Sequence, residues 1–168
     1  MNQVPGCPSP LLGEPMGVKD GRIPNSRLTS SSTWPRNSVT MGRLDYIIYG
    51  GAWIAGADDS DMWVKIDLGK PSYVAGVIVQ GRYSSVYGQW VTSVYISHSL
   101  DDIDWVFALE QECGTRKVYA ANYDGDSHVT LLFPGPINAR YVKIHPITYY
   151  AHPSMRFEVL GSHNITTS

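Results

Sequence analysis

The chain has 168 residues, of which 43% are hydrophobic and 17% are charged, and its formal net charge is −2. This length fits a single domain with one core. The sequence has neither the basic patch of a nucleic-acid-binding protein nor an apolar run close to the roughly 20 residues of a transmembrane segment. A charged fraction below about a quarter favours a secreted or cell-surface recognition protein.

One domain is expected over residues 1–168, with an irregular lead-in over 1–21 and a polar tail over 162–168. The first ten residues carry no apolar signal region, so either a leader is missing or export follows another route. Cys7 and Cys113 have no metal-ligand spacing, and they form either one disulfide or two free thiols. Asn164 begins a glycosylation acceptor triplet, which gives slight support to an extracellular location.

Strand patterns dominate the rest of the chain, because short β-branched runs recur between turn residues and no window has helical periodicity. In residues 63–68, Val64, Ile66 and Leu68 alternate with polar side chains, and Gly69-Lys70-Pro71 is expected to end the strand. Short antiparallel strands without crossover helices predict an all-β sandwich or barrel. Further strands are expected over 73–80, 91–97, 105–107, 129–133, 140–145 and 155–160.

Residues 30–61 show no strand pattern but contain too many aromatic residues for a disordered segment. Two packed loops are expected here, whose apolar residues either plug the end of the barrel or face a ligand. Trp34 lies among turn formers and is expected to be exposed. Trp63, Trp90 and Trp105 are assigned to the core.

The segment 80–90 is the strongest candidate for binding, because it places Arg82, Tyr83 and Tyr87 in a loop between two strands. Arginine offers a planar fork of donors and tyrosine a stiff ring with a polar end. The alternative is a surface hairpin whose tyrosines pack sideways. If the strands run up and down, Tyr150 and His152 close the same end of the sandwich as this loop and residues 30–53.

Catalytic residues are not expected. The five histidines are scattered, and no nucleophile, base and orienting group can be assembled. Acidic clusters at 58–61, 101–104 and 124–126 have turn chemistry, and none has the twelve-residue EF-hand pattern.

Taken in order, several motifs make the chain resemble a discoidin domain, also called the coagulation factor V/VIII type C domain, from Cys7 to Gly161. Residues 89–93, with His145, Pro146 and Tyr149, resemble the slime-mould discoidin lectins and similar invertebrate domains. The motifs are residues 27–32 (RLTSSS), 42–45 (GRLD), 51–53 (GAW), 63–69 (WVKIDLG), 79–82 (VQGR), 97–105, Asn122, 136–146 (PINARYVKIHP) and 155–161 (MRFEVLG).

The resemblance implies an eight-stranded antiparallel jelly-roll β-sandwich with three ligand loops, called spikes, at one end: residues 33–41, 46–52 and 82–88. The family's ligands include galactose-type glycans, anionic phospholipid surfaces, collagen and other proteins, and enzymes are not expected. The resemblance does not decide whether a structural calcium ion binds near Asp45 and Glu158. The candidate ligand-binding residues are Trp34, Arg36, Ile47, Ile48, Tyr49, Arg82, Tyr83, Tyr87, Tyr150 and His152.

One departure from the family concerns the disulfide that usually joins its two ends. Cys7 fits the first position, but Ser162 stands at the second. The resemblance therefore implies that this disulfide is absent, and free thiols are expected.

Three ligand classes follow from these loops. A cell-surface glycan of the galactose or N-acetylgalactosamine type is preferred, because sugars bind through an aromatic face and a few convergent donors. The alternatives are a protein receptor, with the same loops as anchors, and a phosphatidylserine membrane contacted by Trp34, Ile47 and Ile48. The membrane alternative ranks below the glycan because few basic residues accompany these side chains.

Overall fold

The computed structural model describes residues 13–163, and within that range it contains strands and two short 3-10 helices but no α-helix. In the described range, no helix has the length and apolarity needed to cross a bilayer. The strands are β1 (Glu14–Pro15), β2 (Leu28–Ser30), β3 (Trp53–Ile54), β4 (Val64–Gln80), β5 (Trp90–Ser99), β6 (Val106–Phe107), β7 (Tyr119–Ala120), β8 (Val129–Tyr150) and β9 (Ser154–Ser162); the helices are η1 (Asn25–Arg27) and η2 (Val39–Gly42).

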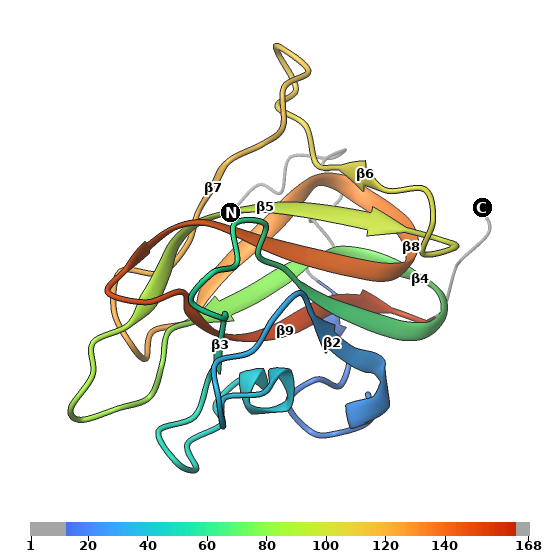
Figure 1. The fold of residues 1–168 in the computed structure, drawn as a ribbon. Coiled ribbons are helices and arrows are strands. Elements are labelled where there is room, and N and C mark those ends of the chain that lie inside the picture. The colour runs from blue at the N-terminus through green and yellow to red at the C-terminus, as the bar shows by residue number, and fades with distance from the viewer. Residues whose placement is uncertain (1–12, 164–168) are drawn as a thin grey trace, which may run out of the picture.

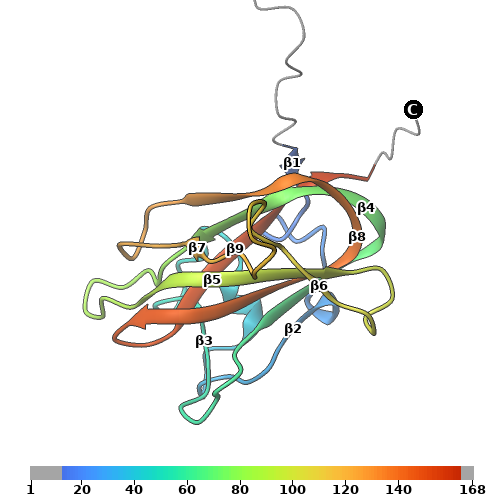
Figure 2. The same ribbon diagram turned by 90° about the horizontal axis from the view of Figure 1, so that it is seen from above.

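Two long strands, β4 and β8, run side by side through both layers of the molecule (Figures 1 and 2). The first part of β4 pairs with β2 and with the second part of β8, which also pairs with β5. The second part of β4 lies between β9 and the first part of β8. The hydrogen-bonded order is β1-β9-β4-β8-β5-β6. The predicted all-β antiparallel, jelly-roll-like fold is confirmed.

The strand boundaries differ from the prediction because the chain bends where breaks were expected. Gly69 adopts φ +87°, a conformation that glycine tolerates, and the register of β4 against β8 shifts between Asp67 and Ser72. Residues 63–68 and 73–80 therefore belong largely to one strand, as do 129–133 and 140–145. Residues 13–163 form nine strands rather than eight, and one of them, β1, lies within the lead-in that the sequence predicts to be irregular.

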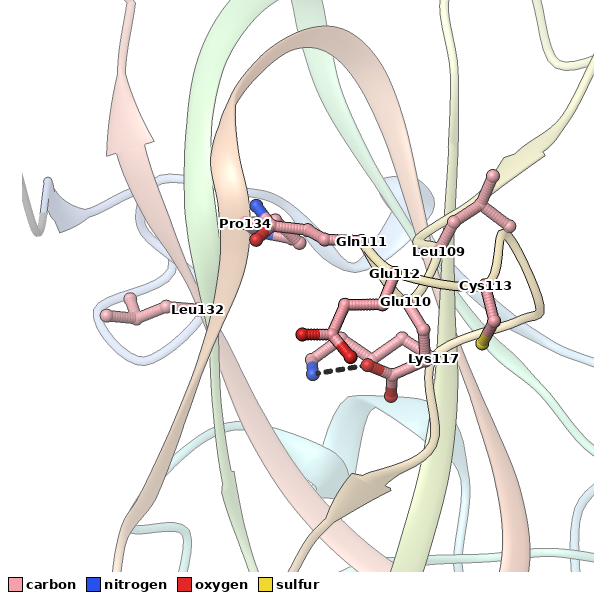
Figure 3. A pocket seen from close by; sticks show the side chains of 8 residues that line it. All are labelled: Leu109, Glu110, Gln111, Glu112, Cys113, Lys117, Leu132 and Pro134. Carbon is pink, nitrogen blue, oxygen red and sulfur yellow. Dashed lines mark hydrogen bonds and ion pairs between the residues drawn. The ribbon is translucent and has the colours of Figure 1, made fainter.

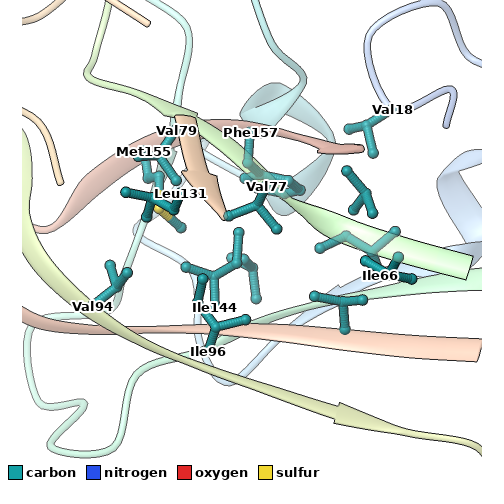
Figure 4. Packing of buried hydrophobic residues seen from close by; sticks show 14 of the residues in the cluster. Val18, Ile66, Val77, Val79, Val94, Ile96, Leu131, Ile144, Met155 and Phe157 are labelled. Carbon is teal, nitrogen blue, oxygen red and sulfur yellow. The ribbon is translucent and has the colours of Figure 1, made fainter. Parts of the chain in front are cut away.

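The core fills the space between the two layers (Figure 4). The predicted alternation of β4 is confirmed, since Val64, Ile66 and Leu68 are buried. Trp53, from the long loop segment, is also fully buried, and its indole N–H donates to Ser32 O at 2.9 Å. This residue plugs the end of the sandwich rather than facing a ligand. Side chains that Figure 4 shows meeting here include Ile66, Val77, Val79, Val94, Ile96, Leu131, Ile144, Met155 and Phe157.

The assignment of three tryptophans to the core is wrong. Trp63, Trp90 and Trp105 are only half-buried. Trp63 and Trp90 precede the inward-facing Val64 and Val91, so the alternation of a strand turns both indoles outward. Trp90 stacks on Tyr150 with ring centroids 4.6 Å apart.

Candidate functional site

A pocket of 320 Å³ is lined by residues from loops at one end of the sandwich. The β4–β5 loop and the β8–β9 turn, which contribute to it, lie at the left in Figure 1. Its walls come from the segment after β2, from β3, from the β4–β5 loop and from the β8–β9 turn. Four of its residues are among those predicted from the sequence. The pocket is lined by Trp34, Asn37, Ile54, Arg82, Tyr87, Gln89 and His152.

A tight turn presents Trp34 to this pocket. Asn37 N–H donates to Trp34 O at 2.9 Å, Pro35 occupies the second position, and Arg36 has φ +74° at the third. These are the features of a type II turn. Trp34 N–H also donates to Ile54 O at 2.7 Å, so the turn is attached to β3. The indole stays 39% exposed and faces the His152 ring, with ring centroids 5.7 Å apart.

Arg82 forms the polar wall of the pocket and joins the second and third spikes. Its Nε donates to Gly50 O at 2.8 Å, and its Nη1 donates to Gln89 Oε1 at 2.8 Å. The guanidinium carbon lies 5.0 Å from the centre of the Tyr87 ring. Burial lowers the pKa of Arg82, yet an arginine remains charged at neutral pH. Its Nη2 makes no hydrogen bond to the described residues and is available as a donor.

Two amide side chains complete the pocket, and the sequence alone does not single out either of them. Gln89 Oε1 accepts from Arg82 and from Ser154 Oγ (3.1 Å), so its Nε2 has no acceptor among residues 13–163. Asn37 Nδ2 donates to Ala52 O at 3.2 Å, which leaves Oδ1 as the free acceptor. Both residues are nearly buried. Amides are common on protein surfaces, so only these contacts distinguish the two from other polar residues.

The second spike stands apart from this pocket. Ile47 and Ile48 are 57% and 54% exposed, and Tyr49 is 89% exposed. Tyr49 has φ +56° and lies directly before Gly50, the residue that Arg82 holds. The apolar tip is therefore attached to the pocket through the backbone but does not line it.

The remaining predicted residues also lie outside the pocket. Arg36 is exposed at the turn, and Tyr150 stacks on Trp90. Tyr83 lines a neighbouring cavity of 430 Å³ beside Asp124 and Asp126, on the other side of Arg82, which lines both. The structure thus brings Trp34, Arg82, Tyr87 and His152 together and separates the other six.

Arg156, a fully buried residue of β9, holds three loops in place beneath the spikes. It donates to Tyr46 O at 2.9 Å, to Gly81 O at 2.8 Å and to Gly125 O at 3.0 Å. Burial lowers its pKa, and the contact of Nη2 with Asp126 Oδ1 at 3.2 Å opposes that effect. This arrangement fixes the entry points of the second and third spikes.

The two carboxylates considered for calcium do not fit that ion. Lys19 Nζ lies 2.7 Å from Asp45 Oδ2, and His128 Nε2 lies 2.6 Å from Asp45 Oδ1. Glu158 accepts from the backbone N–H groups of Val18 and Lys19 at 3.0 and 2.8 Å. A calcium ion needs six to eight oxygen ligands, whereas protein donors already occupy these carboxylates. Residues 13–163 contain no group of three or more His, Cys, Asp or Glu side chains that could hold a metal.

A wider cavity of 590 Å³ lies under the loop that joins β6 to β7 (Figure 3). Its charges are partly paired, since Lys117 Nζ lies 3.4 Å from Glu110 Oε2. No aromatic ring lines it, and none of the predicted ligand-binding residues does. Cys113 at its edge is an exposed free thiol, whereas Cys7 and Asn164 lie outside the described residues.

Comparison with known proteins agrees with this geometry. The model of the F5/8 type C domain family matches residues 26–159. Lactadherin of Rattus norvegicus is 36% identical over 163 residues, which cover 93% of this chain and 38% of lactadherin. The chain therefore spans well under half of that relative's length.

Two solved structures share the fold. Recombinant discoidin II of Dictyostelium discoideum has a TM-score of 0.70 and 28% sequence identity, covering 84% of this chain and 57% of that one. The family 32 carbohydrate-binding module of Clostridium perfringens NanJ, solved in complex with galactose, has a TM-score of 0.61 and 20% identity, covering 82% of this chain and 96% of the module.

Proposed function

Because the chain belongs to the F5/8 type C (discoidin) family of non-catalytic domains, we propose that it is an extracellular recognition domain that binds cell-surface glycans. The pocket between Trp34 and Arg82 receives the terminal sugar, which is of the galactose or N-acetylgalactosamine type. A glycoprotein or glycolipid that carries this sugar is the partner.

One observation carries the proposal: ring faces and free hydrogen-bonding groups converge in a single pocket of 320 Å³. Trp34, Tyr87 and His152 supply rings against which the apolar face of a sugar packs. Arg82 Nη2 and Gln89 Nε2 donate to hydroxyl groups, and Asn37 Oδ1 accepts from one. Sites for small molecules combine apolar walls with a few placed polar groups in this way. A solved neighbour that holds galactose supports the choice of sugar.

Retention on galactose-agarose, with elution by free galactose, tests this function. Arg82→Lys keeps the charge but loses the planar fork that contacts Gly50 and Gln89, so we expect galactose affinity to fall about 10-fold or more. Arg36→Lys is the matched control and leaves retention unchanged, because Arg36 does not line the pocket. Wild-type protein that passes through the column and binds no galactose or N-acetylgalactosamine on a glycan array contradicts the proposal.

A second candidate function is adhesion to an anionic membrane, and the exposed second spike favours it. Ile47 and Ile48 are more than half exposed, and exposed apolar side chains can enter the lipid interface. We expect sedimentation with phosphatidylserine liposomes to be lost in Ile47→Ser/Ile48→Ser, while galactose binding persists. Equal sedimentation with phosphatidylcholine and phosphatidylserine, or none with either, removes this candidate.

A further inference from the structure

A second pocket, of 380 Å³, opens on the outer face of the β5–β8 layer and shares no residue with the galactose pocket. Tyr95 and His145 face each other across β5 and β8, and Phe107 comes from β6. Arg116 reaches in from the loop before β7, and Asp61 and Met62 come from the segment before β4. The pocket thus combines three aromatic rings with one cation and one anion.

Arg116 has the geometry of a prepared anion receptor. Its guanidinium carbon lies 3.7 Å from the centre of the Phe107 ring and 5.8 Å from that of Tyr95. The guanidinium group therefore packs against aromatic rings. No side-chain hydrogen bond or ion pair joins Arg116 to residues 13–163, so the donors of its fork are open. A planar fork of this kind matches a carboxylate with two parallel hydrogen bonds.

The floor of the pocket is fixed by a hydrogen bond to a buried serine. Ser97 is fully buried, and its Oγ lies 2.7 Å from His145 Nε2. This contact orients the imidazole and leaves Nδ1 as its remaining polar atom. The Phe107 and His145 ring centroids are 5.0 Å apart. Burial lowers the pKa of His145 to about 4, so the ring is neutral near pH 7 and can exchange hydrogen bonds with a hydroxyl.

The balance of charge around His145 favours an acidic ligand. Lys143 and Arg116 both lower the pKa of His145 through their positive charge, and Asp61 alone raises it. Lys143 Nζ lies 4.5 and 4.2 Å from the ring centres of Trp63 and Trp105, and no carboxylate within the described chain pairs with it. Lys143 does not line the pocket, but its charge adds to that of Arg116, so two cations and one anion act on His145.

We infer that this pocket is a second binding site, for a sugar that carries a carboxylate. The carboxylate binds the fork of Arg116, and the apolar face of the sugar ring packs against Tyr95 and Met62. Hydroxyl groups meet His145 Nδ1 and the Asp61 carboxylate, which accepts from them. The volume of 380 Å³ is within the range of small-molecule sites.

Titration of ¹⁵N-labelled protein with sodium glucuronate, followed by NMR, tests the inference. We expect saturable shifts of the Arg116 Nε–H signal and of the amides of Tyr95, Phe107 and His145. Glucose has the same ring but no carboxylate, and sodium acetate has the carboxylate but no ring. Each should bind at least 10-fold more weakly than glucuronate. Equal binding of either one, or no response to glucuronate, overturns the inference.

Variants test whether the NMR shifts caused by glucuronate arise from binding in this pocket. Arg116→Gln removes the charge from an exposed side chain and should weaken glucuronate binding at least 10-fold, with the rest of the amide spectrum unchanged. Arg22→Gln, a change at an exposed arginine elsewhere, leaves the affinity unaltered. Arg82→Lys likewise leaves glucuronate affinity unaltered. The proposal for this pocket and the proposal for the galactose pocket are therefore tested independently. Glucuronate affinity that persists in Arg116→Gln refutes the assignment.

Discussion

Arg36 occupies the turn position that usually belongs to glycine, because its φ is +74°. A non-glycine residue in this region costs about 1 kcal/mol or more, and Arg36 makes no contact with the pocket that would offset the cost. We expect Arg36→Gly to leave galactose affinity unchanged and to keep or raise stability, by up to about 1 kcal/mol. Urea unfolding and galactose titration of the variant measure both quantities.

The opposite result has a clear meaning. A loss of galactose affinity in Arg36→Gly, with stability intact, would show that the Arg36 side chain reaches the ligand after all. The pocket would then extend over the Trp34 turn rather than end at the indole.

Single residues of the site were partly predictable. Trp34, Arg82, Tyr87 and His152 could be selected because they are aromatic or basic side chains in loops that alternating strands bring to one end of the sandwich. Asn37 and Gln89 could not, because their roles depend on which of their two amide atoms a neighbour occupies. Ile47, Ile48 and Tyr49 were correctly placed in a loop, but the sequence does not show that the second spike turns away from the pocket.

Among the elements, β9 has the greatest influence on the loops, through Arg156. Glutamine has only two N–H donors, so replacing Arg156 by glutamine leaves at least one of the carbonyls of Tyr46, Gly81 and Gly125 without its donor. Since an unsatisfied buried group costs about 1–3 kcal/mol, we expect Arg156→Gln to lose unfolding free energy in that range. Galactose binding should fall with it, because Arg82 follows Gly81 directly.

Arg140→Gln is the matched control, since Arg140 is also paired with an aspartate (Asp67) but lies far more exposed. Arg140→Gln should lower the unfolding free energy far less than Arg156→Gln, because an exposed ion pair contributes little to stability. Equal effects of the two substitutions in chemical denaturation would contradict the role given to Arg156.

The hydrophobic pattern predicts which face of β4 is buried, but it does not predict that β4 and β8 are each continuous strands. Alternation identified Val64, Ile66 and Leu68 as the inward face, because burial of one face fixes the period of a strand. It could not show that the chain continues through Gly69 and Pro71, because a glycine and a proline mark a bend and a break alike. The strand count depends on that difference, whereas the fold class does not.

For the whole molecule, the environment of His145 predicts a dependence of stability on pH. Burial lowers its pKa from 6.5 to about 4, so between these values the unfolded chain binds a proton that the folded chain does not. Stability is therefore fully present above pH 6.5 and is lost as the pH falls towards 4. The contribution is about 3 kcal/mol across this window.

Urea unfolding at pH 7.0, 5.5 and 4.5 measures how the free energy of unfolding changes with pH. Comparison with His145→Gln separates it from the carboxylates, which titrate mostly below pH 4.5. We expect the wild-type unfolding free energy to decline faster than that of the variant between pH 7.0 and 4.5. Parallel profiles would show that His145 is not buried in the neutral form.

The proposed function requires that a sugar occupies the pocket beside Trp34. The most direct measurement is a titration of the ¹⁵N-labelled protein with N-acetylgalactosamine, in buffer containing a calcium chelator, while the indole N–H signals are followed. Binding of the sugar in this pocket should produce a saturable shift of the Trp34 signal together with the Arg82 Nε–H signal. The Trp53 indole, which is buried and bonded to Ser32, should not move. An unchanged Trp34 signal at saturating sugar, or a shift that requires calcium, would contradict the account.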